Sequence, residues 1–180
     1  MTDRTASLRI LTTLAVLANA PVYAADGVKI DEIVVAASID DAQRDQTVKA
    51  ARAFYDFWNN GDENSLESAV ASTFTDRTLP PGRPQGPGGP AFASRQFRSA
   101  VPDLGVTIRK MIVAGDYVTV HMIFTGHFTG TFGTAKGQGQ AIAFNATDLI
   151  KIGNGRITDN WHIEDNLTLL KQMGVSSVGP

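Results

Sequence analysis

The stretch RITDNWHIEDNLTLLKQMG, Arg156–Gly174, decides the fold of this chain. Its first half alternates apolar and polar residues, which predicts a strand, and its second half has leucines at helical spacing, which predicts a short helix. Successive side chains of a strand point to opposite faces. With Trp161 and Ile163 taken as facing inward, Asp165 falls on the inner face too. A carboxylate in such an apolar setting is costly unless it is paired or used.

The chain before this stretch divides into a helical half and a strand-rich half. Residues 105–164 alternate in the same manner around glycine turns at 114–116 and 154–155, which predicts antiparallel strands. Helical spacing and capping residues predict three helices in the first half: 40–60, 63–74 and 91–104. This order predicts an α+β fold in which a curved antiparallel sheet packs against N-terminal helices.

Composition restricts the possible functions. The chain has 180 residues, of which 43% are hydrophobic, so one domain with a real core is expected. The net charge is −2 and no basic patch stands out, so we expect no nucleic-acid partner. Cysteine is absent, which excludes disulfides, zinc–thiolate sites and a cysteine nucleophile.

The N-terminus has the three parts of a secretory signal peptide. A weakly basic start is followed by a short apolar run, 10–18, and by the small-residue pattern VYA that ends at Ala24. The run is too short to span a bilayer, so no stable membrane insertion is expected after cleavage. The alternative is a disordered or helical tail. We predict a periplasmic or secreted protein with four segments: a signal peptide at 1–24, an N-terminal arm at 25–39, a single domain at 40–175 and a C-terminal tail at 176–180.

One loop is unusual in composition. Residues 78–90, TLPPGRPQGPGGP, hold five prolines and four glycines, so they can form neither a helix nor a central strand. Such a loop could be a lid over an active-site entrance or a stiff connector.

Three blocks of the sequence resemble the SnoaL-like polyketide cyclases of the nuclear transport factor 2-like superfamily: FYDFWNNGD, FRSAVPDLGVTIRKMIVAGDYVTV and DLIKIGNGRITDNWHIEDNLTLLKQMG. The resemblance covers about residues 40–175. It implies a cone-shaped α+β barrel with a deep apolar pocket, a homodimer formed through the sheet, and the aspartate after the tryptophan, Asp165, as the acid–base residue. Family members close polyketide rings by intramolecular aldol chemistry, and superfamily relatives isomerise, dehydrate or open epoxides, so the fold alone does not fix the reaction.

Three side chains are candidates for catalysis. Asp165 could act as a general acid or base if an apolar pocket raises its pKa. The alternative is that it caps the helix that begins at Asn166, because aspartate is a favoured N-cap. His121 lies within an apolar strand, and Tyr55 has a hydroxyl that could hold an enolate oxygen.

The expected substrate-binding residues are mostly aromatic. Any one of them could instead be ordinary core. Asp148, in phase with Phe144 on a predicted strand, is a second buried carboxylate if that face is interior. The full set is Trp58, Phe54, Phe124, Phe144, Asp148, Trp161, Asn59 and Arg98. The histidines lack the spacing of a metal site, so we expect neither a metal nor another cofactor.

These features together predict a secreted, cofactor-independent enzyme of cyclase, isomerase or lyase type. It would transfer a proton at carbon on a small hydrophobic carbonyl or aromatic substrate. The alternative is a non-catalytic binder of such a molecule. A third possibility is a structural or dimerisation module, whose pocket would be filled by side chains.

Overall fold

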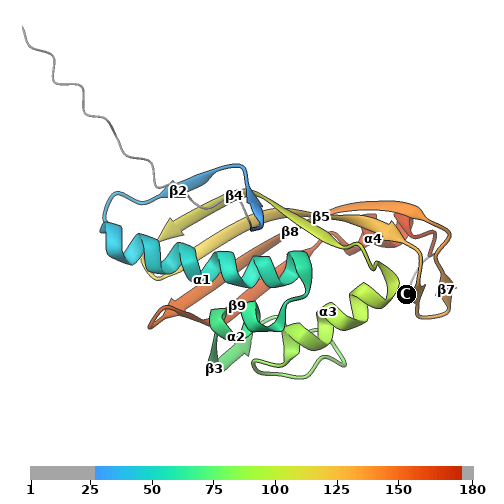
Figure 1. The fold of residues 1–180 in the computed structure, drawn as a ribbon, viewed down its shortest axis with the longest axis horizontal. Helices are drawn as coiled ribbons and strands as arrows, with labels where there is room; N and C mark the ends of the chain where they lie inside the picture. The colour runs from blue at the N-terminus through green and yellow to red at the C-terminus, as the bar shows by residue number, and fades with distance from the viewer. Residues whose placement is uncertain (1–26, 176–180) are drawn as a thin grey trace, which may run out of the picture.

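A computed structural model describes residues 27–175, so the predicted signal peptide and the tail at 176–180 lie outside the described residues. Three of the four helices lie together on one side of a seven-stranded sheet with the order β1-β4-β5-β8-β9-β3, in which β2 also pairs with β4, and the C-terminal helix packs apart from them against β8 (Figure 1). The helices are α1 (Asp41–Asn60), α2 (Glu63–Ala69), α3 (Gly89–Ala100) and α4 (Asn166–Gln172). The strands of the sheet are β1 (Lys29–Ile30), β2 (Ile33–Val35), β3 (Val70–Asp76), β4 (Gly105–Ala114), β5 (Tyr117–Phe128), β8 (Gln140–Gly153) and β9 (Arg156–Glu164).

Helix α1 begins and ends where its sequence predicts. The side chain of Asp40 accepts a hydrogen bond from the backbone N–H of Gln43 at 2.8 Å, and Gly61 ends the helix in the left-handed conformation, with φ of 81°. The buried face of α1 includes Phe54 and Tyr55, which are almost fully enclosed. This helix therefore supplies aromatic side chains to the concave side of the sheet.

The second helix is shorter than predicted. It ends at Ala69, and the residues that follow form β3, which pairs parallel to β9. The prediction of a helix over 63–74 is therefore wrong beyond Ala69. Threonine and β-branched residues are frequent from Val70 onward, and they favour a pleated, half-buried strand over a helix.

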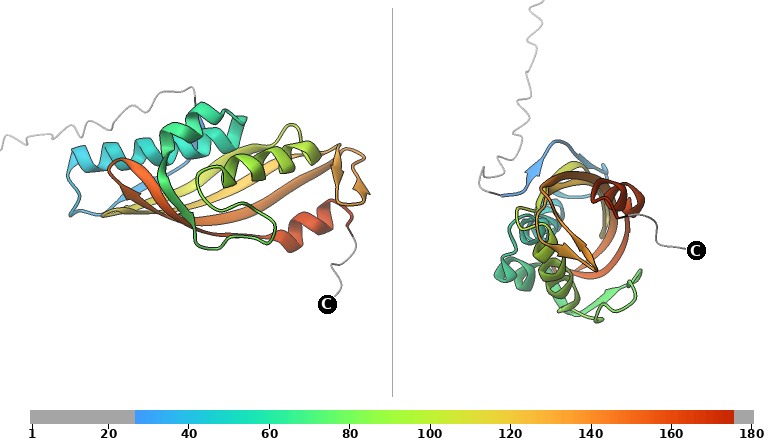
Figure 2. Two further views of the ribbon diagram at one scale, coloured as in Figure 1. Left: turned by 90° about the horizontal axis from the view of Figure 1, so that it is seen from below. Right: turned by 90° about the vertical axis from the view of Figure 1, so that its right-hand side faces the viewer.

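The middle of the sheet is antiparallel and its edges are parallel. Strands β4, β5, β8 and β9 pair antiparallel in sequence order, whereas β1, β2 and β3 add parallel pairs at the two edges. In the end-on view of Figure 2 the strands curve around the side on which α1 and α3 lie. The fold is thus the expected α+β arrangement, and its concave side is closed by helices.

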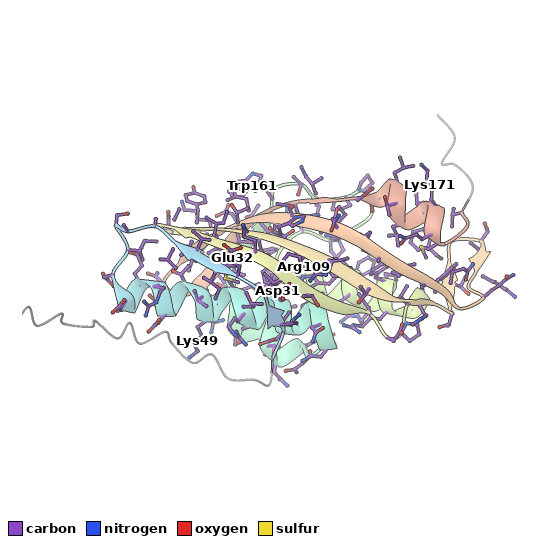
Figure 3. All side chains as sticks on the ribbon, turned by 90° about the horizontal axis from the view of Figure 1, so that it is seen from above. Asp31, Glu32, Lys49, Arg109, Trp161 and Lys171 are labelled. Carbon is purple, nitrogen blue, oxygen red and sulfur yellow. The ribbon has the colours of Figure 1, made fainter. Side chains whose placement is uncertain are left out.

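A short arm precedes α1 and lies along β4. Its strands pair with β4, and the carboxylate of Asp31 contacts Arg109 of β4 at 2.8 Å on the outer surface (Figure 3). Glu32 and Lys110 form a similar pair at 3.1 Å. The arm is thus an ordered part of the sheet edge. Within residues 27–175, no helix is long and apolar enough to cross a membrane.

A small hairpin extends β5 and β8 at the end of the sheet near α3. It consists of β6 (Thr131–Phe132) and β7 (Ala135–Lys136), which pair only with each other. Phe132 is partly exposed and lines the same cavity as Phe92 of α3. These two rings therefore mark a side on which the cavity reaches the surface.

Candidate active site

A cavity of about 610 Å³ lies between the concave sheet and the helices. Much of its wall is aromatic, with Phe124 and Phe144 stacked at 5.2 Å between ring centroids and Trp58 edge-on to Phe124 at 6.1 Å. Phe54 is also on the wall. The structure therefore brings together four of the aromatic residues that the sequence assigns to substrate binding.

Asp148 lies inside this cavity on β8. Strict alternation along β8 turns it inward with Phe144 and Ala146, and its side chain is only 6% exposed. The Tyr55 hydroxyl donates a hydrogen bond to Asp148 Oδ2 at 2.9 Å. Burial raises the pKa of Asp148 to about 7, although the Tyr55 bond opposes this effect. Burial and the neighbouring carboxylate raise the pKa of Tyr55 well above its usual value, so the phenol stays a donor.

A second polar group stands beside Asp148, on β9. His162 is the cross-strand partner of Asp148 and is 8% exposed. Its Nε2 lies 3.1 Å from both carboxylate oxygens of Asp76, and its Nδ1 lies 2.6 Å from Glu164 Oε1. Burial disfavours the imidazolium, but Glu164 and Asp76 outweigh it and raise the pKa of His162 to about 9. His162 is therefore a cation held between two carboxylates at neutral pH.

The proline–glycine loop forms part of the cavity wall. The side chain of Gln85 accepts a hydrogen bond from the backbone N–H of Asp76 at 2.8 Å and donates one to its carbonyl at 2.9 Å. Arg83, which lines the cavity, approaches Asp76 Oδ2 at 3.4 Å. These contacts fasten the loop to β3 beside the charged residues of the site.

Asp165 is not in the cavity. It is the exposed N-cap of α4, where it accepts hydrogen bonds from the backbone N–H of Thr168 at 3.0 Å and from its hydroxyl at 2.7 Å. Those bonds lower the pKa of Asp165. The prediction that Asp165 is a poorly hydrated catalytic carboxylate is therefore wrong, and the alternative reading as a helix cap is correct.

The error arises from a bulge in β9. Ile152 pairs with Ile157, but the next residue on β8, Lys151, pairs with Asp159, so Thr158 is an extra residue on β9. A bulge of this kind exchanges the faces of the residues that follow it. Ile157 points inward, as does His162, while Ile163 is 75% exposed.

Four other candidates also lie outside the cavity, each for a structural reason. His121 is exposed on the outer face of β5, with Nδ1 2.9 Å from the Thr147 hydroxyl. Trp161 is on the outer side of β9 (Figure 3). The side-chain oxygen of Asn59 accepts a hydrogen bond from the N–H of Val106 at 2.9 Å.

Arg98 binds the backbone rather than the cavity. Its guanidinium donates to the carbonyl oxygens of Leu104 at 3.1 Å and Trp58 at 2.7 Å. Partial burial lowers its pKa. Because His121, Trp161, Asn59 and Arg98 are not on the cavity wall, the expectation that they contact substrate is wrong.

Several polar residues of the site were missed from the sequence: Asp76, Asn160, His162 and Glu164. The last three alternate along β9, and this i, i+2 spacing was a usable signal, because it places three polar side chains on one strand face. Among residues 27–175, no group of three or more histidines and carboxylates is arranged to hold a metal ion.

Comparisons with known proteins agree with this architecture. The SnoaL-like polyketide cyclase family model matches residues 48–173. A proposed polyketide cyclase from Bacillus cereus ATCC 10987 is 36% identical, with 86% of this chain and 97% of that chain covered and a TM-score of 0.76. TsrD from Streptomyces laurentii is 25% identical, with 77% and 99% covered and a TM-score of 0.65.

More distant structures support the fold alone. IdmH from Streptomyces antibioticus, a proposed polyketide cyclase, is 24% identical, with 72% of this chain and 99% of that chain covered and a TM-score of 0.65. No curated protein gives a match to this sequence. The family model spans more than two thirds of the chain, and the chain therefore belongs to the SnoaL-like polyketide cyclase family, with a nuclear transport factor 2-like fold.

Proposed function

We propose that this protein is a cofactor-independent enzyme that transfers a proton at carbon, with Asp148 as its general acid–base. One observation carries the proposal: a buried carboxylate with a pKa of about 7 lies within an aromatic-walled cavity. A base whose pKa is near the working pH is half available and still strong enough to remove a proton. Family membership supports cyclase or isomerase chemistry of this kind.

The reaction begins with the removal of a proton from a carbon next to a carbonyl group. Asp148 takes the proton, and the electron pair of the C–H bond moves toward the carbonyl oxygen to form an enolate. In ring closure the enolate carbon attacks a second carbonyl of the same substrate, and the proton held by Asp148 passes to the alkoxide oxygen that forms. In isomerisation the enolate is conjugated with a neighbouring double bond, and Asp148 returns the proton to the far carbon of that system. Tyr55 touches Asp148 and serves to position it.

The cavity favours a flat hydrophobic substrate. The stacked pair Phe124 and Phe144 and the edge-on Trp58 offer aromatic contacts on one side. The charged residues Asp76, Asp148 and His162 lie along the sheet on another. A substrate with a ring system and a carbonyl group satisfies both surfaces, because rings pack on aromatic walls and the carbonyl polarises the reacting C–H bond.

The test compares two identical changes at different aspartates. We expect Asp148→Asn to reduce solvent deuterium uptake at the α-carbons of a bicyclic ketone such as 2-tetralone by about 10²–10⁴-fold, since the general base is lost. Asp165→Asn is the matched control and should keep the wild-type rate, because asparagine also caps helices. Proton NMR in D₂O measures the uptake. Equal uptake by Asp148→Asn and wild type would contradict the proposal, and a ligand that binds but never exchanges would instead indicate a binding protein.

A further inference from the structure

Arg83 is a charged side chain on the cavity wall that uses little of its hydrogen-bonding capacity. It belongs to the proline–glycine loop, and its side chain is 22% exposed. A guanidinium has five N–H donors, and within residues 27–175 Arg83 makes one hydrogen bond, from Nη1 to Asp76 Oδ2 at 3.4 Å. Its Nε and Nη2 make no hydrogen bond to these residues and are not enclosed by them. A bound molecule can therefore reach both nitrogens.

The carboxylates beside Arg83 have closer partners. Asp76 Oδ1 accepts a hydrogen bond from the backbone N–H of Thr78 at 3.0 Å, and both oxygens of Asp76 lie 3.1 Å from His162 Nε2. Glu164 lies 2.6 Å from the other ring nitrogen of His162. Burial favours the neutral form of Glu164, but its bond to His162 and the charges of His162 and Arg83 lower its pKa. Arg83 is thus a second cation beside this cluster, with N–H groups that the cluster leaves unused.

The other strong donors on the cavity wall are already engaged. Both ring nitrogens of His162 contact carboxylates, and the Tyr55 hydroxyl donates to Asp148. When Asp148 removes a proton from carbon, the negative charge moves to the carbonyl oxygen of the substrate, and a donor at that oxygen lowers the barrier. Among the cations that line the cavity within residues 27–175, Arg83 alone has unused N–H groups for this purpose.

Arg83 and the base lie on two sides of His162. Asp148 is the cross-strand partner of His162, whose ring contacts Asp76, and Asp76 in turn contacts Arg83. A base, the carbon that it deprotonates, the neighbouring carbonyl oxygen and the donor to that oxygen together span about 8 Å, because each polar contact is about 3 Å long. A carbonyl group that lies across His162 can therefore meet Asp148 at one end and Arg83 at the other.

We infer that Arg83 is a second catalytic residue, which donates hydrogen bonds to the carbonyl oxygen next to the reacting carbon. The proton goes to Asp148, the electron pair of the C–H bond becomes the carbon–carbon π bond of the enolate, and the carbonyl π pair moves onto the oxygen held by Arg83. This inference rests on the proposed function, because it adds a residue to the same reaction. It also gives the proline–glycine loop a part in catalysis, since the loop carries the guanidinium and Gln85 fastens it to β3.

Exchange rates of arginine variants test the inference. We expect Arg83→Gln to exchange the α-protons of 2-tetralone about 10²-fold more slowly than wild type, the usual cost of one lost donor to a developing oxyanion. Arg83→Lys should have an intermediate rate, because lysine keeps the charge but not the planar fork of donors. The rates are compared at pH 8.5, where Asp148 is largely ionised, so that a change in its pKa contributes little. Arg77→Gln is the matched control and should keep the wild-type rate, because Arg77 pairs with Asp159 away from the cavity wall.

Binding of tetralin, which has the same ring skeleton without the carbonyl oxygen, separates lost chemistry from a displaced loop. Equilibrium dialysis should give Arg83→Gln the wild-type dissociation constant for tetralin, because Arg83 acts on the oxygen that tetralin lacks. A wild-type exchange rate in Arg83→Gln would overturn the inference, and so would a rate loss matched by an equal loss of tetralin affinity, which would show that Arg83 only holds the loop. In either case Asp148→Asn would still lose exchange, so the proposed function is judged by that variant and not by Arg83.

Discussion

Asp148 and Asp165 carry the same functional group at two places in the chain, and their surroundings change its pKa in opposite directions. Asp148 lies in the middle of β8, where the alternation of a regular strand turns it into an aromatic cavity. Asp165 follows the last residue of β9, where the strand gives way to α4 and its carboxylate is exposed. Burial raises the pKa of the first, and two hydrogen bonds to Thr168 lower the pKa of the second.

The difference shows that the environment of a carboxylate, more than its place in a motif, determines its chemistry. A carboxylate with a raised pKa can exchange protons near neutral pH, whereas a capped and solvated one stays ionised. The apolar neighbours of Asp165 in sequence, Trp161 and Ile163, face outward, so they do not desolvate it. Three measurements would sharpen or break this contrast.

The largest expected difference is in how stability depends on pH. The pKa of Asp148 rises from 3.8 in the unfolded chain to about 7 in the folded protein, so the folded state binds more protons between these values. The contribution of Asp148 to the free energy of unfolding is therefore fully present below pH 3.8 and is lost as the pH rises through 7. The loss amounts to about 4 kcal/mol. In Asp148→Asn this decline should disappear.

Asp165 should show the opposite sign. Folding lowers the pKa of Asp165. Its contribution to the free energy of unfolding is therefore present at pH values above its unfolded pKa and is lost as the pH falls below that pKa. Urea unfolding of wild type, Asp148→Asn and Asp165→Asn from pH 2 to 8 measures both effects, because the Asp165 contribution is lost only below its unfolded pKa of 3.8. His162 has a folded pKa of about 9 and an unfolded pKa of 6.5, so it stabilises the folded protein fully below pH 6.5 and loses that effect between pH 6.5 and 9. This change is expected in wild type and in both variants. Parallel curves for wild type and Asp148→Asn would show that Asp148 is not a raised-pKa group.

A smaller effect is expected from Tyr55→Phe. The Tyr55 hydroxyl stabilises the carboxylate of Asp148, so its removal should raise the pKa of Asp148 further. The loss of one hydrogen bond to a charged group corresponds to about one pH unit. We expect deuterium exchange to fall by up to about tenfold at pH 6 and to return toward the wild-type rate at pH 9.

The matched control for this change is Tyr117→Phe, because Tyr117 is partly exposed and is not on the cavity wall. Its pH–rate profile should coincide with that of wild type. A Tyr55→Phe profile that is lower at every pH by the same factor would contradict a role in tuning Asp148 and would indicate that the phenol acts on the substrate directly.

The sequence predicts much of the fold because local signals agree with the tertiary structure. Helix α1 has its cap residues at both ends, and β8 alternates without interruption, so the inward placement of Asp148 follows from period two alone. The end of α2 at Ala69 was missed, because Val70–Phe74 becomes a strand only through pairing with β9. The paired residues are more than 80 positions apart, so the β-branched residues of this segment were its only local sign of a strand.

The site was harder to predict than the fold. A bulge at Thr158 exchanges the inward-facing and outward-facing side chains in the rest of β9. The hydrophobic pattern does not indicate this bulge, because Trp161 and Ile163 are apolar and yet face outward. The same bulge turns Asn160 and His162 inward. Asp76 joins them only because β3 pairs with β9, so its role depends on tertiary structure.

The smallest expected effect belongs to the helix cap. Asp165→Ala removes both hydrogen bonds to Thr168, and we expect a loss of about 1 kcal/mol in the free energy of unfolding. Asp165→Asn keeps a capping oxygen and should remain within a few tenths of a kcal/mol of wild type. Both variants should exchange deuterium at the wild-type rate, because the cap lies outside the cavity. Slower exchange in Asp165→Asn at unchanged stability would place Asp165 back in the chemistry and would remove the contrast with Asp148.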